Sequence, residues 1–120
     1  MATQLEPSEQ EAEKLVRDYQ ALQEQIRVSA LQLDQLRNQK TDLERAQEEL
    51  QKAEGKVFLT VGGVIVEITK DKALGEVKDR LGLSEARTQS MNKQYTELKN
   101  REKQLSEKIT QLYKAGQGAT

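Results

Sequence analysis

Apolar residues recur at alternating spacings of three and four in two long stretches, which flank a short segment of alternating β-forming residues. The first stretch fits a heptad repeat, with leucine at every d position except that of Ser29 and a more mixed a series. Its d positions are Leu15, Leu22, Ser29, Leu36, Leu43 and Leu50, and its a positions are Tyr19, Ile26, Leu33, Lys40 and Gln47. A repeat sustained over about five heptads predicts a coiled-coil helix.

The second stretch has the same spacing, and the two stretches match in length and phase. Each apolar seam needs a partner, and the other stretch of the same chain is the simplest one. We therefore expect an antiparallel two-helix coiled coil, a thin rod about 68 Å long for helices of about 45 residues. The pairs in this register are Leu50 with Val77, Leu43 with Ser84, Leu36 with Met91, Leu33 with Tyr95, Leu22 with Leu105 and Leu15 with Leu112.

Local signals predict where the two helices begin and end. Ser8 and Glu11 have the spacing of a capping box at a helix start, and Gly55 supplies a helix end. Thr69 or Asp71 can cap the second helix. We expect a single domain over residues 1–120, with helices over 8–54 and 71–115, a hairpin over 56–70, and flexible ends at 1–7 and 116–120.

The segment between the helices is predicted to be a β-hairpin. Its residues alternate around Gly62-Gly63, and two glycines can supply the positive φ angles of a two-residue turn. One face would carry Val57, Leu59, Val61, Val64, Val66 and Ile68, and the other the mixed set Phe58, Thr60, Ile65, Glu67 and Thr69. A lone hairpin is marginal in water and has two open edges.

Burial of the six apolar residues favours assembly. Each contributes ~1.5–3 kcal/mol, so six could supply roughly 10 kcal/mol, an upper-range figure because the free hairpin already shields some area. We therefore expect hairpins of several subunits to pair edge to edge into a sheet or barrel. The expected oligomerisation residues are Val57, Leu59, Val61, Gly62, Gly63, Val64, Val66 and Ile68.

The hairpin motif Val61-Gly62-Gly63-Val64-Ile65-Val66-Glu67, set between two coiled-coil arms of near-equal length, resembles the prefoldin family. The resemblance covers essentially the whole chain. It is to the β-type subunit class, because the α-type class is expected to carry two hairpins and this chain has one. Within that class it is similar to both the eukaryotic subunit 2 and the archaeal β-type sequences. The implied fold is mainly α, a coiled coil with one hairpin that joins a β-barrel-like body.

The resemblance implies a hexamer of two α-type and four β-type subunits, whose hairpins form the body and whose coiled-coil tips hold unfolded proteins. It also implies that these clients pass to a group II chaperonin without ATP. The residues expected to form the client-holding tip are Leu5, Leu15, Val16, Tyr19, Ile109, Leu112 and Tyr113. Ile109 and Leu112 fall on the predicted seam, whereas Leu5 and Tyr113 fall off it and are better placed to contact clients.

Composition narrows the chemistry. Lysine and arginine number 19 against 20 aspartates and glutamates, so the net charge is −1, which gives no electrostatic footprint for nucleic acid or an anionic membrane. The chain has no cysteine and no histidine, which excludes disulfides and the usual zinc sites. A pair of helices offers no concave cavity of the usual size for catalysis. We expect no catalytic residue, no cofactor and a cytoplasmic location.

Two function classes remain open from the sequence. The first is an ATP-independent holdase subunit of a chaperone complex, and the second is a structural coiled-coil tether or scaffold that uses the hairpin only to oligomerise. They differ in what the helix tips bind. A holdase slows the aggregation of many unrelated unfolded proteins, whereas a scaffold binds one or a few folded partners.

Overall fold

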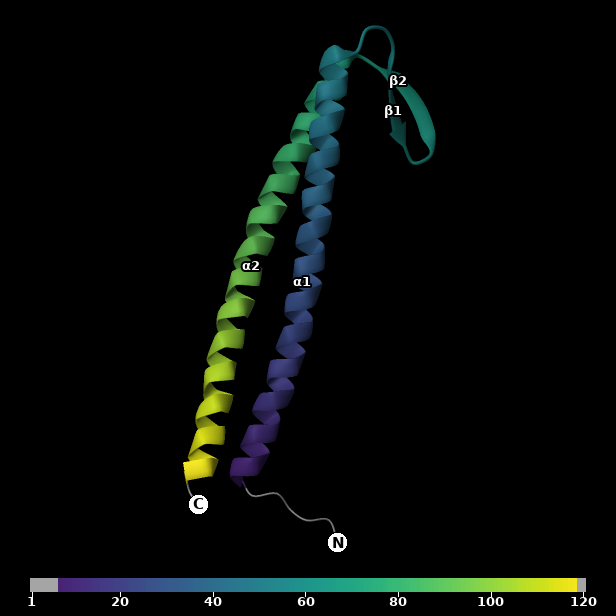
Figure 1. The fold of residues 1–120 in the computed structure, drawn as a ribbon. Coiled ribbons are helices and arrows are strands. Elements are labelled where there is room, and N and C mark those ends of the chain that lie inside the picture. Colours follow the sequence, from purple (N-terminus) through teal and green to yellow (C-terminus); the bar gives the residue numbers. More distant parts are fainter. Residues whose placement is uncertain (1–6, 119–120) are drawn as a thin grey trace. The chain divides into compact units, whose positions relative to one another are not determined.

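The structure, a computed structural model, describes residues 7–118, and the side chains of residues 8–116. It contains two long helices, α1 (Pro7–Lys52) and α2 (Lys70–Gly118), joined by the strands β1 (Val57–Val61) and β2 (Val64–Ile68) (Figure 1). The strands form one antiparallel two-stranded sheet. The predicted fold class, two helices connected by a single β-hairpin, is confirmed.

The chain divides into two compact units. The hairpin unit is Gln32–Met91, and the terminal unit combines the described parts of Met1–Leu31 and Asn92–Thr120. In both units a segment of α1 lies beside a segment of α2, and side chains from both helices line shared grooves. α2 runs through two glycines, Gly75 and Gly82, without interruption.

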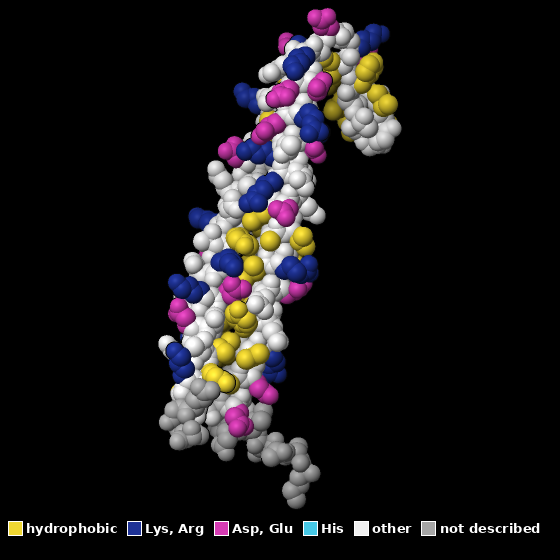
Figure 2. All heavy atoms as spheres, in the orientation of Figure 1, with side chains coloured by type: hydrophobic (Ala, Val, Ile, Leu, Met, Phe, Trp, Pro, Cys, Tyr) yellow, Lys and Arg dark blue, Asp and Glu magenta, His cyan; other side chains and the backbone are white. Residues whose placement is uncertain are grey.

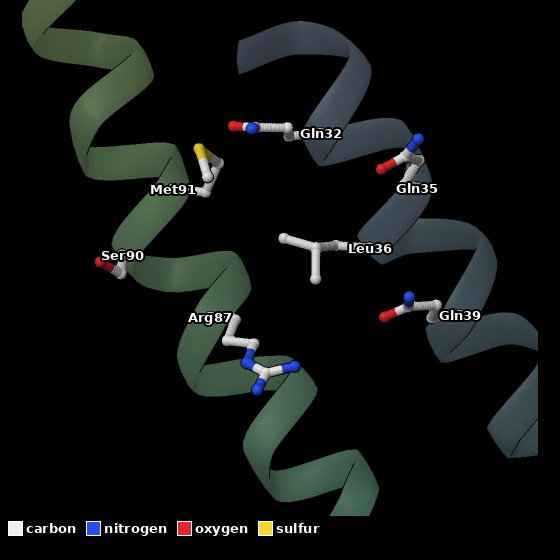
Figure 3. A pocket seen from close by; sticks show the side chains of 7 residues that line it. All are labelled: Gln32, Gln35, Leu36, Gln39, Arg87, Ser90 and Met91. Carbon is white, nitrogen blue, oxygen red and sulfur yellow. The ribbon is translucent and has the colours of Figure 1, made fainter. Parts of the chain in front are cut away.

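The helices of the hairpin unit are packed in the expected register. Figure 3 shows Leu36 and Met91 extending from α1 and α2 into the space between the helices, with Gln32 and Gln39 beside them. The other predicted pairs in this unit also share grooves. They are Leu43 with Ser84 and Leu50 with Val77.

The terminal unit follows the same register. Leu22 and Leu105, which the register pairs, line one groove between the helices. Leu22 and Ile26 are buried, and so is Ser29, the polar d position. Coiled-coil packing therefore holds each unit together through heptad positions that are apolar or small.

The start of α1 differs from the expected capping box. The helix begins at Pro7, so Ser8 is its second residue rather than its cap. Proline is favoured at a first helical position because its φ is already helical and its missing N–H would have no partner there. Residues 1–6 and 119–120, within the ends predicted to be flexible, lie outside the described residues.

The junction between α1 and the hairpin is closed by a lysine from the second helix. α1 ends at Lys52, and Gly55 follows with a φ of 101°. The Lys70 Nζ donates hydrogen bonds to the main-chain oxygens of Gln51 (2.8 Å) and Ala53 (3.4 Å). A helix end leaves its last carbonyls without helical partners and carries partial negative charge, so an ammonium group is a suitable cap.

Thr69 caps the start of α2. Its hydroxyl oxygen accepts a hydrogen bond from the Lys72 N–H at 3.2 Å, and its carbonyl oxygen accepts one from the Ala73 N–H at 2.9 Å. Of the two caps considered from the sequence, Thr69 therefore fills the role. At its other end α2 continues through Gly116 to Gly118, beyond the predicted end at 115.

Ser84 provides a test of the polar positions in the seam. It is buried, and its hydroxyl has no hydrogen-bond partner among the described residues. A Ser84→Ala variant removes this unsatisfied group and adds helix propensity, so we expect about 1 kcal/mol of stabilisation and a higher Tm. Thermal unfolding followed by circular dichroism measures it.

The matched control for Ser84→Ala is Ser90→Ala, the same change at an exposed position of α2. It gains helix propensity alone. Equal shifts in Tm for the two variants would show that the buried hydroxyl carries no penalty.

Candidate functional site

The hairpin has the predicted register. Val57 pairs with Ile68, Leu59 with Val66 and Val61 with Val64. Gly62 and Gly63 form the turn with φ angles of 54° and 82°, in the left-handed region that glycine adopts without strain. Cross-strand partners point to the same side of a sheet, so these six apolar residues share one face.

That face is open near the turn and partly covered at its base. Val61 and Val64 are 55% and 61% exposed, and Val66 is also exposed. The other three residues of the face, Val57, Leu59 and Ile68, are half-buried. They line a groove of about 570 Å³ whose other walls come from the adjoining ends of α1 and α2.

The opposite face of the hairpin is more apolar in its exposed area than expected. Phe58 and Ile65 are 56% and 69% exposed, and Figure 2 shows hydrophobic side chains gathered on the hairpin. The sequence predicts a mixed face here, but Phe58 and Ile65 are diagonal neighbours across the paired strands and together form an apolar area. Each strand also has one edge unpaired within the described sheet.

The second apolar surface lies where α1 begins and α2 ends, inside the terminal unit. A groove of about 800 Å³ separates the two helices there, and we call it the terminal groove. Four predicted tip residues line it, Val16 from α1 and Ile109, Leu112 and Tyr113 from α2. Val16 and Tyr113 are 40% and 68% exposed.

Five lining residues of the terminal groove were missed from the sequence. They are Ser8, Glu9, Ala12, Ala115 and Gly116. Ala12 lies one turn before Val16, so its place on the same face of α1 was predictable from helix spacing. The small residues widen the groove because they leave room between the walls.

The remaining predicted tip residues lie elsewhere. Leu15 and Tyr19 are half-buried at seam positions and do not line the terminal groove. Leu5 lies outside the described residues. Within the described part of the chain, the structure thus brings together four of the expected residues and separates two.

Charges on the helices form exposed local pairs. The Lys99 Nζ lies 3.2 Å from a Glu102 carboxylate oxygen, and the Glu102 carboxylate raises the pKa of Lys99, with smaller contributions from Tyr95 and Tyr19. Glu24 and Arg27 form a second pair that lowers the pKa of the glutamate through a hydrogen bond and charge attraction. Exposed pairs of this kind contribute little to stability.

Within residues 7–118, no three or more His, Cys, Asp or Glu residues come together in a group suited to a metal ion. In the same range, neither helix has a stretch apolar enough to cross a membrane. Two exposed apolar surfaces of the described residues bear on function, the hairpin and the terminal groove.

Comparison with known proteins agrees with this architecture. A family model described as "Prefoldin subunit" matches residues 13–116, which include both helical arms and the hairpin. The chain belongs to the prefoldin family. Relatives named prefoldin subunit beta support the β-type class, which the single hairpin of this prefoldin subunit also favours.

Three such relatives show the extent of the similarity. The protein of Methanosarcina acetivorans is 30% identical over 113 residues, covering 92% of this chain and 94% of the relative. That of Pyrococcus furiosus is 29% identical, covering 75% of this chain and 79% of the relative. That of Caldivirga maquilingensis is 28% identical, covering 98% of this chain and 97% of the relative.

A solved structure shows the same fold. The crystal structure of the prefoldin beta subunit from Thermococcus strain KS-1 superposes with a TM-score of 0.79 and covers 92% of this prefoldin subunit and 96% of the solved chain. The two sequences are 24% identical. This likeness supports the arrangement of helices and hairpin.

Proposed function

We propose that this prefoldin subunit belongs to an ATP-independent holdase, a hexamer of two α-type and four β-type subunits in the cytoplasm. The complex holds unfolded proteins at the helix tips and delivers them to a group II chaperonin. This function requires no cofactor and no catalytic step. It involves neither nucleic acid nor a membrane.

The observation that carries the proposal is the terminal groove. It combines apolar side chains from two helices in one concave surface that is open to solvent. Contiguous exposed apolar surface marks a site of interaction. A site that binds mainly through shape and hydrophobicity suits many unrelated clients.

The hairpin supports the assembly step of the proposal. It exposes apolar side chains on both faces and has two unpaired edges, features that association with other hairpins would cover. The proposed partners are α-type prefoldin subunits and further β-type copies. Through such a body, several terminal grooves would act on one client and raise its overall affinity.

The test is a Val16→Ser, Tyr113→Ser double variant in the assembled complex. Both side chains are exposed, so the fold should persist while the groove loses its apolar lining. We expect about tenfold more complex to be needed for half-maximal suppression of aggregation, since the loss of two apolar contacts weakens binding by about 1–2 kcal/mol. Light scattering of several unrelated denatured proteins measures it.

The matched control is Leu83→Ser, which removes an exposed apolar side chain of α2 outside the terminal groove. Its aggregation curve should overlay that of the unchanged complex. Equal suppression by the double variant and the unchanged complex would refute the tip assignment. Binding of one folded partner without any suppression would favour the tether instead.

A further inference from the structure

Most of the wall of the terminal groove offers side chains, because its main-chain groups are already paired. Beyond the first turn of α1 and before the last turn of α2, as at Ala12, Val16 and Ile109, the N–H and C=O groups bond within each helix. An extended segment in the groove would place its own peptide groups against apolar side chains without partners, which is unfavourable. A helical segment satisfies its peptide groups internally, so the groove suits a helix.

The spacing of the wall residues points the same way. Ala12 and Val16 on α1 are one turn apart, and so are Ile109 and Tyr113 on α2. One helical turn rises about 5.4 Å, whereas side chains on one face of a strand repeat every ~6.7 Å. The ridges of a third helix would therefore fit between these walls in step with them.

The terminal groove is also continuous with an existing helix–helix contact. Ile109 and Leu112 belong to the heptad series of α2, the series in which Leu105 shares a groove with Leu22 of α1. The groove begins where this seam opens toward solvent, as the exposure of Val16 shows. A docked helix would extend the packing of the seam beyond the two helices that form it.

Charge distinguishes the two rims of the groove. Glu9 borders it on α1, and Glu13 lies one turn further along the same helix. The α2 residues of the lining are Ile109, Leu112, Tyr113, Ala115 and Gly116, and none of them is acidic. A complementary helix therefore carries lysine or arginine on the flank that faces α1.

We propose that the terminal groove recognises amphipathic helical segments of its clients, with apolar residues at i, i+3, i+4 and i+7 and a basic flank. The inference rests on the proposed holdase function and specifies which class of client segment the site takes. Helix-in-groove recognition reads such anchors on one apolar face.

The experiment compares two labelled peptides of identical composition by fluorescence anisotropy with the full chain. One has leucines at the helical spacing, lysines on one flank, and a hydrocarbon staple on its outer face. The other alternates leucine and lysine in the pattern of a strand. It carries the same hydrocarbon attached to one residue only, so that the hydrocarbon does not enforce a helix. We expect the helical peptide to bind about tenfold more tightly, because it alone fits the turn spacing of the walls.

Three variants locate the binding and test the role of charge. Tyr113→Ser should abolish the preference for the helical peptide, whereas Leu83→Ser should leave it unchanged. Glu13→Gln should weaken the lysine-flanked helix and leave a glutamine-flanked helix unaffected. Equal or tighter binding of the alternating peptide would overturn the proposal, as would self-association of the chain that depends on Tyr113 without any peptide binding.

The outcomes separate this inference from the function on which it rests. If the Val16→Ser, Tyr113→Ser variant loses aggregation suppression but both peptides bind the unchanged chain equally, the holdase function stands and the helix preference is wrong. If suppression is unaffected and neither peptide binds, both are wrong.

Discussion

Replacing Val61 and Val64 by lysine should leave the subunit folded but unable to assemble. The two residues are a cross-strand pair next to the turn and are among the most exposed apolar side chains of the hairpin. Assembly would have to bury two like charges in place of two valines, which loses about 3–6 kcal/mol of apolar burial and adds the cost of desolvating the ammonium groups. Multi-angle light scattering should give the variant the mass of a single chain, both by itself and when it is mixed with a two-hairpin α-type subunit.

The matched control places a lysine at an exposed position of α2 in the same unit, as Leu83→Lys. It also converts an exposed apolar side chain to a charge, but away from the hairpin. This control should assemble like the unchanged subunit, and circular dichroism should show equal helix content for both variants. Complexes of unchanged mass from the double-lysine variant would contradict assembly through the hairpin.

Leu33→Ala should be the most destabilising single truncation in the seam. Leu33 is 4% exposed, the lowest value for a large apolar side chain among the described residues. Removing a buried leucine loses its burial and leaves a cavity, together about 3 kcal/mol. For a chain of this size the Tm should fall by more than about 10 °C.

The comparison variant is Leu31→Ala, the same change two positions away. Leu31 is 51% exposed on the outer surface of α1, and alanine is a good helix former, so its Tm should change little. Similar losses of Tm from the two variants would show that the heptad seam does not dominate the stability of the helical pair.

The elements of this fold follow from local patterns, which is why the sequence predicts them. Alternation on both sides of two glycines sets the turn and hence the pairing of Val61 with Val64. The heptad phase likewise sets which faces of the helices meet, so Leu36 and Met91 come together as expected. Such signals act within a few residues or at a fixed period.

The start of α1 was missed because two local signals compete there. Ser8 and Glu11 have capping spacing, but Pro7 directly before them is itself a favoured first helical residue. The helix therefore begins one position earlier, and the serine lies inside it.

The covered base of the hairpin could not be read from alternation. Alternation assigns Val57, Leu59 and Ile68 to the same face as Val61, yet the helix ends half-cover these three and leave Val61 open. The difference depends on how the chain bends between Lys52 and Val57. That bend is a property of tertiary packing.

The sequence predicts the apolar residues of the terminal groove but not its concave shape, because the shape also depends on tertiary packing. The apolar side chains of Val16 and Tyr113 mark them as candidate groove residues in the sequence. A concave surface, however, depends on small residues as much as on hydrophobic ones. Ala12 and Gly116 contribute space rather than hydrophobic area, and that role emerges when two helices are placed side by side. Leu15 has the right chemistry and faces the seam.

The ammonium group that reaches from the first residue of α2 to the last carbonyls of α1 has a mechanical consequence. It joins the adjoining ends of the two helices by a hydrogen bond that bypasses the seventeen-residue connection through the hairpin (residues 53–69). If a neighbouring subunit pulled on the hairpin, the Lys70 hydrogen bond would bear the load before the packed residues of the seam did. The adjoining ends of α1 and α2 are thus held together independently of the hairpin.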